Sequence, residues 1–224
     1  MSAMSAATAP TAAVPRGLYL LLGPQDLPEA QWEARLPALL AAGPALLQLR
    51  SKADAAARRR QAERLLPLCA QAGVPLIIND DIALAARVGA AGVHLGQGDG
   101  APARARAALG PGALIGRTCH ATLALLRQAA REGADYASIG ALYPSATKPA
   151  APRASLETLR AACATGTLPI CAIGGIQATH LAQVQAAGAR LAAVSGAVWQ
   201  APDPARALAA LVRSWAHDSA DPPL

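Results

Sequence analysis

The sequence contains no phenylalanine, and aromatic residues make up only 3% of its 224 positions. Its lysines and arginines outnumber the acidic residues, with a formal net charge of +6, but they lie along helix-like stretches without neighbouring aromatic residues. This distribution is typical of solvated helix faces and argues against a nucleic-acid-binding surface. The longest apolar runs are also far shorter than the roughly 20 residues of a membrane-spanning helix. We therefore expect a protein that binds neither nucleic acid nor membrane.

Cysteines are few, and no two of them form a Cys-x-x-Cys pair; they stand at positions 69, 119, 163 and 171. Neither a zinc site nor a disulfide framework is indicated, so we expect free thiols in a cytoplasmic protein. Residues 1–16 lack the basic and leucine-rich segments of a signal peptide and are predicted to form a flexible tail, as are residues 218–224. Residues 17–217 then form one domain, and the 53% hydrophobic content of the chain supplies a sizeable core.

Short apolar runs alternate with stretches of helical periodicity along this domain. The runs predict strands at 17–23, 45–50, 75–80, 92–97, 113–118, 135–140, 169–175 and 190–196. The periodic stretches predict helices at 28–42, 54–72, 81–89, 101–109, 122–132, 155–164, 177–187 and 203–217. Glycine follows many of these helices, as expected where a helix ends.

Eightfold alternation of strand and helix indicates an α/β protein with a parallel sheet, either open and doubly wound or closed into a barrel. An open sheet of this kind usually carries a Gly-x-Gly-x-x-Gly fingerprint after its first strand, whereas this chain has GPQDLP there. The count of eight and the absence of a linker favour a single (β/α)8 TIM barrel.

Two acidic residues, Asp80 and Asp99, follow the third and fourth predicted strands. Neighbouring strands lie about 4.8 Å apart, and TIM barrels build their active sites at the carboxyl ends of the strands. The two carboxylates can therefore converge on one point, where a cation such as Mg²⁺ would relieve their repulsion. The alternative is that each acid caps the helix that follows it, and position alone does not separate the two interpretations.

The other strand ends also carry polar groups. Gln48, Arg50 and Lys52 are spaced two apart and share one face of the second strand. The loop YPSATKPAAP follows the sixth strand, and its Ser145, Thr147 and Lys148 are all donors suited to phosphate. The remaining strand ends carry Thr118, Gly174-Gly175 and Ser195-Gly196, and barrels commonly bind phosphate at the last two strands. Two anionic sites at one barrel mouth indicate a transferase acting on two phosphorylated substrates.

At this point the motifs resemble those of the thiamine-phosphate synthase family, also called thiamine-phosphate pyrophosphorylase. The resemblance runs from about Gly17 to about Ala197 and includes QLRSK, LIINDDIALAARVGAAGVHLGQGD, IGRTCH, GADYASIGALYPSATKPAAP, ICAIGGI and AAGARLAAVSGAV. The long block around Asp80 and Asp99 and the Thr-Lys-Pro loop are specific, whereas AIGGI is shared by many phosphate-binding barrels. Thr118 stands where the family often has serine, and Ser145 where threonine is common, so both hydroxyls are kept.

The resemblance implies a Mg²⁺-dependent transferase of thiamine biosynthesis. Hydroxymethylpyrimidine diphosphate would lose pyrophosphate and be joined to the nitrogen of thiazole phosphate, giving thiamine phosphate. By residue matching, the metal ligands would be Asp80 and Asp99, and the catalytic residues Arg50, Lys52, Thr118 and Lys148. The full substrate-binding set would be Gln48, Leu49, Arg50, Ser51, Lys52, Asn79, Thr118, Ser145, Ala146, Thr147, Lys148, Gly175, Val194 and Ser195. A homo-oligomer is compatible with this sequence.

One rival function belongs to a close relative on the same barrel, and a second belongs to another class. A thiazole tautomerase would use a base, and His120 stands where that relative carries one. The retained acids Asp80 and Asp99, together with Lys148, favour the synthase. A non-catalytic sensor of a thiamine precursor would be expected to show a degraded diphosphate site, and the motifs above are intact.

Overall fold

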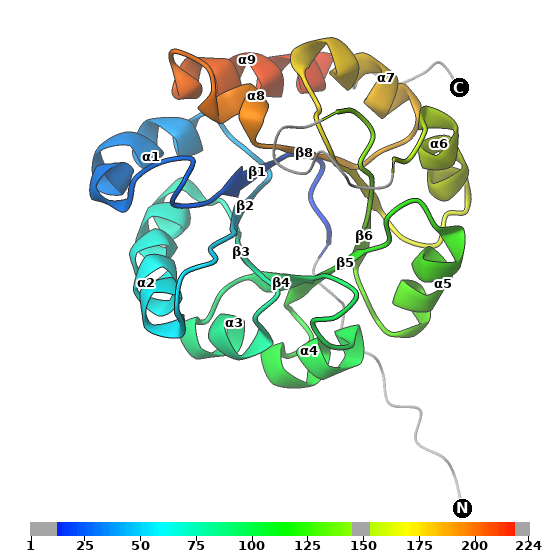
Figure 1. Cartoon of the computed structure of the whole chain (residues 1–224), viewed down its shortest axis with the longest axis horizontal. Helices are drawn as coiled ribbons and strands as arrows, with labels where there is room; N and C mark the ends of the chain where they lie inside the picture. Colours follow the sequence, from blue (N-terminus) through cyan, green and yellow to red (C-terminus); the bar gives the residue numbers. More distant parts are fainter. Residues whose placement is uncertain (1–12, 145–152, 218–224) are drawn as a thin grey trace, which may run out of the picture.

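The computed structural model describes residues 13–144 and 153–217, and it has the predicted barrel architecture. Eight parallel strands pair in sequence order, and β8 returns to pair with β1, which closes the barrel. Figure 1 looks into this barrel, with the helices arranged around the outside of the strands. Among the described residues, no helix has both the length and the apolar character that crossing a membrane requires.

The strands begin within one residue of the predicted positions. They are β1 Gly17–Leu22, β2 Leu46–Leu49, β3 Leu76–Asn79, β4 Gly92–Leu95, β5 Leu114–Thr118, β6 Tyr136–Ile139, β7 Ile170–Ala172 and β8 Leu191–Val194. The helices are η1 Glu29–Gln31, α1 Trp32–Ala41, α2 Ala55–Ala72, α3 Ile82–Val88, α4 Pro102–Leu109, α5 Leu123–Arg131, α6 Leu156–Ala164, η2 Ala178–His180, α7 Leu181–Ala186, α8 Gly196–Trp199 and α9 Pro204–His217. Among the elements of the described residues, the short helix α8, directly after β8, was not predicted as a helix.

Local chemistry explains several helix boundaries. The carboxylate of Asp54 accepts a hydrogen bond from the backbone N–H of Ala57 and so caps α2. At the other end of α2, Gly73 adopts a left-handed conformation with φ of 67°, which glycine tolerates without strain. A glycine with positive φ also follows α3, at Gly89.

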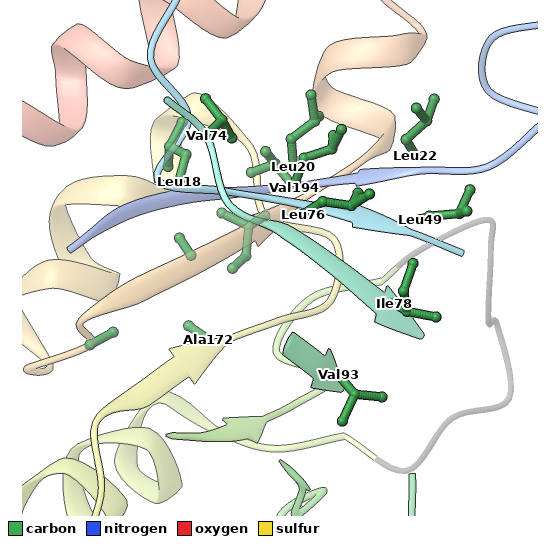
Figure 2. Packing of buried hydrophobic residues seen from close by; sticks show 14 of the residues in the cluster. Leu18, Leu20, Leu22, Leu49, Val74, Leu76, Ile78, Val93, Ala172 and Val194 are labelled. Atoms are coloured by element: carbon green, nitrogen blue, oxygen red, sulfur yellow. The ribbon is translucent and has the colours of Figure 1, made fainter. Parts of the chain in front are cut away.

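The core has two apolar layers. The larger one lies between the strands and the surrounding helices, and Figure 2 shows part of it, including Leu20, Ile78 and Val194. The smaller layer fills the interior of the barrel and includes Tyr19, Tyr136 and Leu191. Val14, within the segment predicted as a tail, is also buried against this inner layer, and Arg190 Nε donates to its carbonyl. The inner layer does not extend over the carboxyl ends of the strands, where polar groups lie instead.

Candidate active site

The acidic pair predicted from the sequence comes together at the ends of β3 and β4. Asp80 has a left-handed backbone with φ of 66°, and its carboxylate accepts a hydrogen bond from Asn79 Nδ2. Asp99 turns back on its own loop, where its Oδ2 accepts a hydrogen bond from the N–H of Gly96. Partial burial, together with hydrogen bonding to Asp99 and the charge of Asp99, raises the pKa of Asp80 to about 6. Both acids also line the same hollow, so their carboxyl groups converge at this edge of the mouth.

Neither acid caps a helix. The residue that caps α3 is Asp81, whose carboxylate accepts a hydrogen bond from Leu84 N. The residue before α4 is Ala101, which has no side-chain cap. The helix-cap interpretation of Asp80 and Asp99 is therefore wrong, and their convergence needs another explanation.

The donor chemistry of this pair fits a hard divalent cation. Both groups offer carboxylate oxygens, which Mg²⁺ prefers, and their mutual repulsion would be relieved by a cation between them. The described residues contain no cluster of three or more His, Cys, Asp or Glu side chains that could enclose a metal on their own. Mg²⁺ is typically held by only one or two carboxylates together with substrate phosphates. Two acids at an open barrel mouth are therefore consistent with the usual coordination of Mg²⁺.

A hollow of about 310 Å³ adjoins the acidic pair on the side of α3 and α4. Two arginines line it, Arg58 and Arg104, and Arg58 forms an ion pair with the cap residue Asp81 at 3.3 Å. The acidic pair is thus open to solvent and has positive charge close by.

Replacing Asp80 by asparagine should stabilise the metal-free protein. Asparagine tolerates the left-handed backbone at this position and removes a charge that burial and Asp99 disfavour in the fold. We expect a gain in unfolding free energy of up to about 1 kcal/mol near neutral pH, discounted from the full pKa shift because the side chain is solvent-exposed. The measurement is urea unfolding in the presence of a chelator.

The sign of this effect also fixes its pH dependence. The pKa of Asp80 is raised in the fold from 3.8 to about 6, so the penalty is present above that value and disappears as the pH falls toward 3.8. The advantage of Asp80→Asn should shrink over the same range. Asp99→Asn should give a similar gain, and the double variant should add little, because one neutral partner already ends the repulsion. Equal stability of all four proteins would contradict the contact between the two acids.

Cationic groups flank the acidic pair. Arg50 follows β2, and its charge lowers the pKa values of both Asp80 and Asp26, although burial leaves each of them raised overall. Lys52 is exposed beyond it. The predicted residues Ser145, Ala146, Thr147 and Lys148 lie outside the described residues. Asp26 was not singled out by the sequence; it accepts a hydrogen bond from Gly23 N and places a third acid near Arg50.

The structure separates predicted site residues that can use side chains from those that can use only backbone. Leu49 and Val194 point into the outer apolar layer, so only their backbone groups can face a ligand at the mouth. Gln48 points into the barrel, and Thr118 ends β5 at the mouth. Ser51 is half-buried in the loop after β2, where its hydroxyl accepts from Ala53 N.

Glycines shape the far side of the mouth, at the end of β7. Gly174 and Gly175 both have positive φ, at 104° and 63°. A side chain on Gly175 would place its Cβ 2.3 Å from the carbonyl oxygen of Pro144, so the β7 loop can approach the β6 loop only with glycine here. Ser195 follows β8, the strand next to β7, and directly precedes α8. The residues predicted for a second phosphate site thus include Gly175, where the backbones of the β6 and β7 loops come close together.

Sequence reasoning also missed Arg117 on β5, a supporting residue. It is buried, and its guanidinium donates to backbone carbonyls of Gly96, Gln97 and Gly100, within the loop that carries Asp99. A charged residue inside the strand LIGRT was the available signal, because arginine is rarely buried without partners. Arg117 therefore fixes the loop that holds one half of the acidic pair.

Comparisons with known proteins give the family of this chain. A sequence model of the family described as thiamine monophosphate synthase matches residues 18–198. The chain belongs to this family. It is 50% identical over 202 residues to the thiamine-phosphate synthase of Thioalkalivibrio sulfidiphilus, covering 88% of this chain and 95% of that one. It is 45% identical over 206 residues to the thiamine-phosphate synthase of Thiobacillus denitrificans, covering 91% and 97%.

Among solved structures, the thiamine phosphate pyrophosphorylase of Pyrococcus furiosus superposes on this family member with a TM-score of 0.81 at 26% sequence identity. The superposition covers 91% of this chain and 96% of the other. The fold and family predicted from the sequence are therefore confirmed.

Proposed function

We propose that this chain is a thiamine-phosphate synthase of thiamine biosynthesis. It joins hydroxymethylpyrimidine diphosphate to thiazole phosphate, forms thiamine phosphate and releases pyrophosphate. Family membership supports the reaction class, and the observation that carries the proposal for this site is the convergence of Asp80 and Asp99 on one hollow at the barrel mouth. Neither acid serves as a helix cap, and a cation between them would relieve the repulsion of two carboxylates at one point.

The diphosphate end of the first substrate lies at the acidic pair and the neighbouring cations. Asp80 and Asp99 would hold Mg²⁺, which when bound offsets the negative charge that gathers on the departing diphosphate. Arg50 and Lys52, after β2, are assigned to the same anion, and Lys148 is assigned to it by residue matching alone. Asn79 keeps the Asp80 carboxylate in place through its hydrogen bond. Such groups act most strongly where charge develops in the transition state.

The bond changes need no protein base. The bond between the pyrimidine methylene carbon and the diphosphate oxygen breaks, and its electron pair leaves with the diphosphate. The lone pair of the thiazole nitrogen then forms the new carbon–nitrogen bond. The protein's part is to hold that nitrogen in line with the methylene carbon while water is kept out. Atoms and charge balance without a proton transfer.

The thiazole phosphate lies on the far side of the mouth, at the β6, β7 and β8 loops. We assign its phosphate to Ser145, Ala146, Thr147, Gly175, Val194 and Ser195. Val194 takes part through backbone only, because its side chain is buried in the outer layer. The close approach of the loops at Gly175 supports this placement.

A Gly175→Ala variant should weaken thiazole phosphate binding more than pyrimidine diphosphate binding. The new Cβ would meet the carbonyl oxygen of Pro144 and force the two loops apart. We expect KM for thiazole phosphate to rise at least about tenfold, with a smaller change for the other substrate. Steady-state kinetics with each substrate varied in turn measure this.

The matched control is Gly166→Ala. Gly166 has a similar φ of 59°, but a Cβ there would meet nothing within 4 Å. This variant carries the same backbone strain without the clash, so it should lose stability and keep both KM values. Equal effects of the two variants on KM would contradict the assignment of Gly175.

The tautomerase alternative depends on His120. This residue is exposed at the end of β5, with a left-handed backbone at φ of 50°. Its carbonyl accepts a hydrogen bond from Gly140 N, which links the β5 and β6 loops. The acidic pair favours the synthase, because an isomerisation releases no diphosphate and does not require a pair of metal-binding carboxylates.

The direct test is to incubate the purified full chain with both substrates and Mg²⁺ and to follow thiamine phosphate and pyrophosphate together. Equal amounts of the two products are expected, and none when either substrate or Mg²⁺ is omitted. Release of pyrophosphate without thiamine phosphate would refute the proposed transfer.

We further place the protein in the cytoplasm, because all four cysteines are free thiols.

A further inference from the structure

A line of hydrogen-bonded side chains crosses the inside of the barrel and joins two predicted binding residues. Gln48 Nε2 lies 2.7 Å from the hydroxyl of Tyr19, which lies 3.1 Å from the hydroxyl of Tyr136. That hydroxyl lies 3.2 Å from His94 Nδ1, and His94 Nε2 lies 3.0 Å from the Thr118 hydroxyl. The line runs from β2 through β1, β6 and β4 to β5. We call these five residues the buried line.

The fold makes room for the buried line. A Cβ on Gly116 of β5 would lie 2.2 Å from the Tyr136 ring and 2.3 Å from His94 Nδ1, so the line passes over a strand position that lacks a side chain. Four of the five residues are at most 6% exposed, Thr118 being the exception at the mouth. Burial raises the pKa values of Tyr19 and Tyr136, so both stay as neutral phenols with one proton each.

One proton per hydroxyl forces the whole line to run in a single direction. In the first direction Gln48 Nε2 donates to Tyr19, each tyrosine donates to the next group, and His94 carries its proton on Nε2 and donates to Thr118. The Thr118 proton is then left to donate at the mouth, and Gln48 has its oxygen on the side away from Tyr19. No hydrogen bond from the described residues reaches that oxygen.

The second direction reverses every bond. Thr118 then donates to His94, which carries its proton on Nδ1, and Tyr19 donates to the Gln48 oxygen. Thr118 has only lone pairs for a ligand, and Gln48 turns its amine outward. Ser138, whose hydroxyl lies 3.4 Å from His94 Nε2, is compatible with both directions because a hydroxyl can donate or accept.

We propose that an anion at Thr118 selects the first direction and thereby makes Gln48 present an acceptor to the pyrimidine. A diphosphate oxygen can only accept, so it is bound well only when Thr118 donates. Gln48 then offers its oxygen, which suits a ring bearing an amino group and opposes a ring with an oxo group there. The buried line thus couples diphosphate binding to amino-group specificity. This inference rests on the proposed substrates, whose binding is tested separately below.

The first test reads the direction from the tautomer of His94 in the full-length protein. Nitrogen-15 NMR of labelled histidine distinguishes the Nε2–H form from the Nδ1–H form, and a His94→Gln variant assigns the signal. The probe is Mg²⁺ with inorganic pyrophosphate, which needs no pyrimidine. The Nε2–H form is expected in this complex. An Nδ1–H form or a doubly protonated ring with pyrophosphate bound would overturn the inference.

The second test measures whether the two ends are coupled. Calorimetry without thiazole phosphate gives Kd for the aminopyrimidine diphosphate, its oxo analogue, and the two corresponding alcohols without diphosphate. In the wild type, the preference for amino over oxo should be at least about tenfold larger in the diphosphates than in the alcohols. In Tyr136→Phe, which breaks the buried line in the middle, the two preferences should agree within about threefold.

Ser138→Ala is the matched control, because it removes a buried hydroxyl beside His94 and leaves the buried line intact. It should keep the wild-type difference between diphosphates and alcohols. If Tyr136→Phe does not fold, Thr118→Val removes the terminal hydroxyl at the barrel mouth and should abolish the same difference. A uniform loss of affinity with unchanged preferences would mean that Tyr136 is only structural, and the inference would be wrong.

Failure of the proposed function gives a different result. If the wild type binds neither pyrimidine diphosphate but binds Mg²⁺ and pyrophosphate with His94 in the Nε2–H form, the substrate assignment is wrong and the direction of the line is right. If the wild type binds and transforms both substrates but shows no coupling, the proposed function holds and the inference falls.

Discussion

Replacing Asp80 or Asp99 by alanine should lower the rate of thiamine phosphate formation at least about a thousandfold and leave the barrel folded. Both acids lie at the mouth rather than in either apolar layer, so their loss removes no core packing. What is lost is half of the site that offsets the charge of the departing diphosphate. The rate should be measured over a range of Mg²⁺ concentrations, because a weakened metal site is partly restored at high Mg²⁺.

Asp81→Ala provides a control one residue away. Asp81 caps α3 through Leu84 N, and loss of such a cap typically costs about 1 kcal/mol of stability. This variant should therefore lower the melting temperature while keeping turnover within about threefold of the wild type. Asp80→Ala should instead lose turnover and remain folded. Near-normal turnover of Asp80→Ala at limiting Mg²⁺ would contradict the metal assignment.

The adjacent residues Asp80 and Asp81 also show what a sequence can and cannot settle. Both follow the same apolar run, and either one can cap a helix that begins after it. The choice depends on the backbone: φ of 66° at Asp80 turns its carboxylate toward Asp99, and Asp81 then occupies the cap position. That single torsion angle is not encoded in the hydrophobic pattern, which specifies where a strand ends but not how the chain turns there.

The strands and most helices were predictable because burial on a barrel strand and amphipathicity on a covering helix leave different periods in the sequence. The helix α8 leaves almost no such signal, since four residues span barely one turn. The buried line was beyond prediction for another reason. Its members come from five strands and meet across the barrel interior, so their contact depends on strand register and on the missing side chain at Gly116.

The remaining site residues were assigned by their match to the family, and the structure shows which of them can use their side chains. Gln48 and Leu49 were both matched to the substrate site, but successive residues of a strand point to opposite faces. Gln48 enters the barrel and joins Tyr19, whereas Leu49 packs against the helices. A residue match therefore places a position near the ligand without saying whether its side chain or its backbone makes the contact.

Arg50→Ala should reduce turnover far more than His120→Asn, and this comparison separates the synthase from the tautomerase. Arg50 lies close enough to Asp80 and Asp26 for its charge to lower both pKa values, which places the guanidinium beside the proposed diphosphate site. A charged, forked donor facing a leaving anion contributes most as the bond breaks. We expect a loss of at least about a hundredfold at saturating substrates.

Arg50→Lys sharpens the interpretation of that loss. Lysine keeps the positive charge but lacks the paired donors of the guanidinium. An intermediate rate for Arg50→Lys would indicate that both the charge and the fork matter, and a rate equal to that of Arg50→Ala would assign the effect to geometry alone. Near-normal turnover of Arg50→Ala would show that Arg50 does not take part in the proposed diphosphate site.

His120→Asn should cost no more than about tenfold, since the proposed transfer moves no proton through this residue, whereas an essential base would be worth about 10²–10⁴-fold. Asparagine is suited to this position because it tolerates the left-handed backbone at φ of 50°, so the substitution tests side-chain chemistry without breaking the link from the His120 carbonyl to Gly140. The rate of thiamine phosphate formation is measured for both variants under saturating substrates. An inactive His120→Asn beside an active Arg50→Ala would reverse the ranking and make base catalysis, rather than stabilisation of the leaving diphosphate, the chemistry of this barrel.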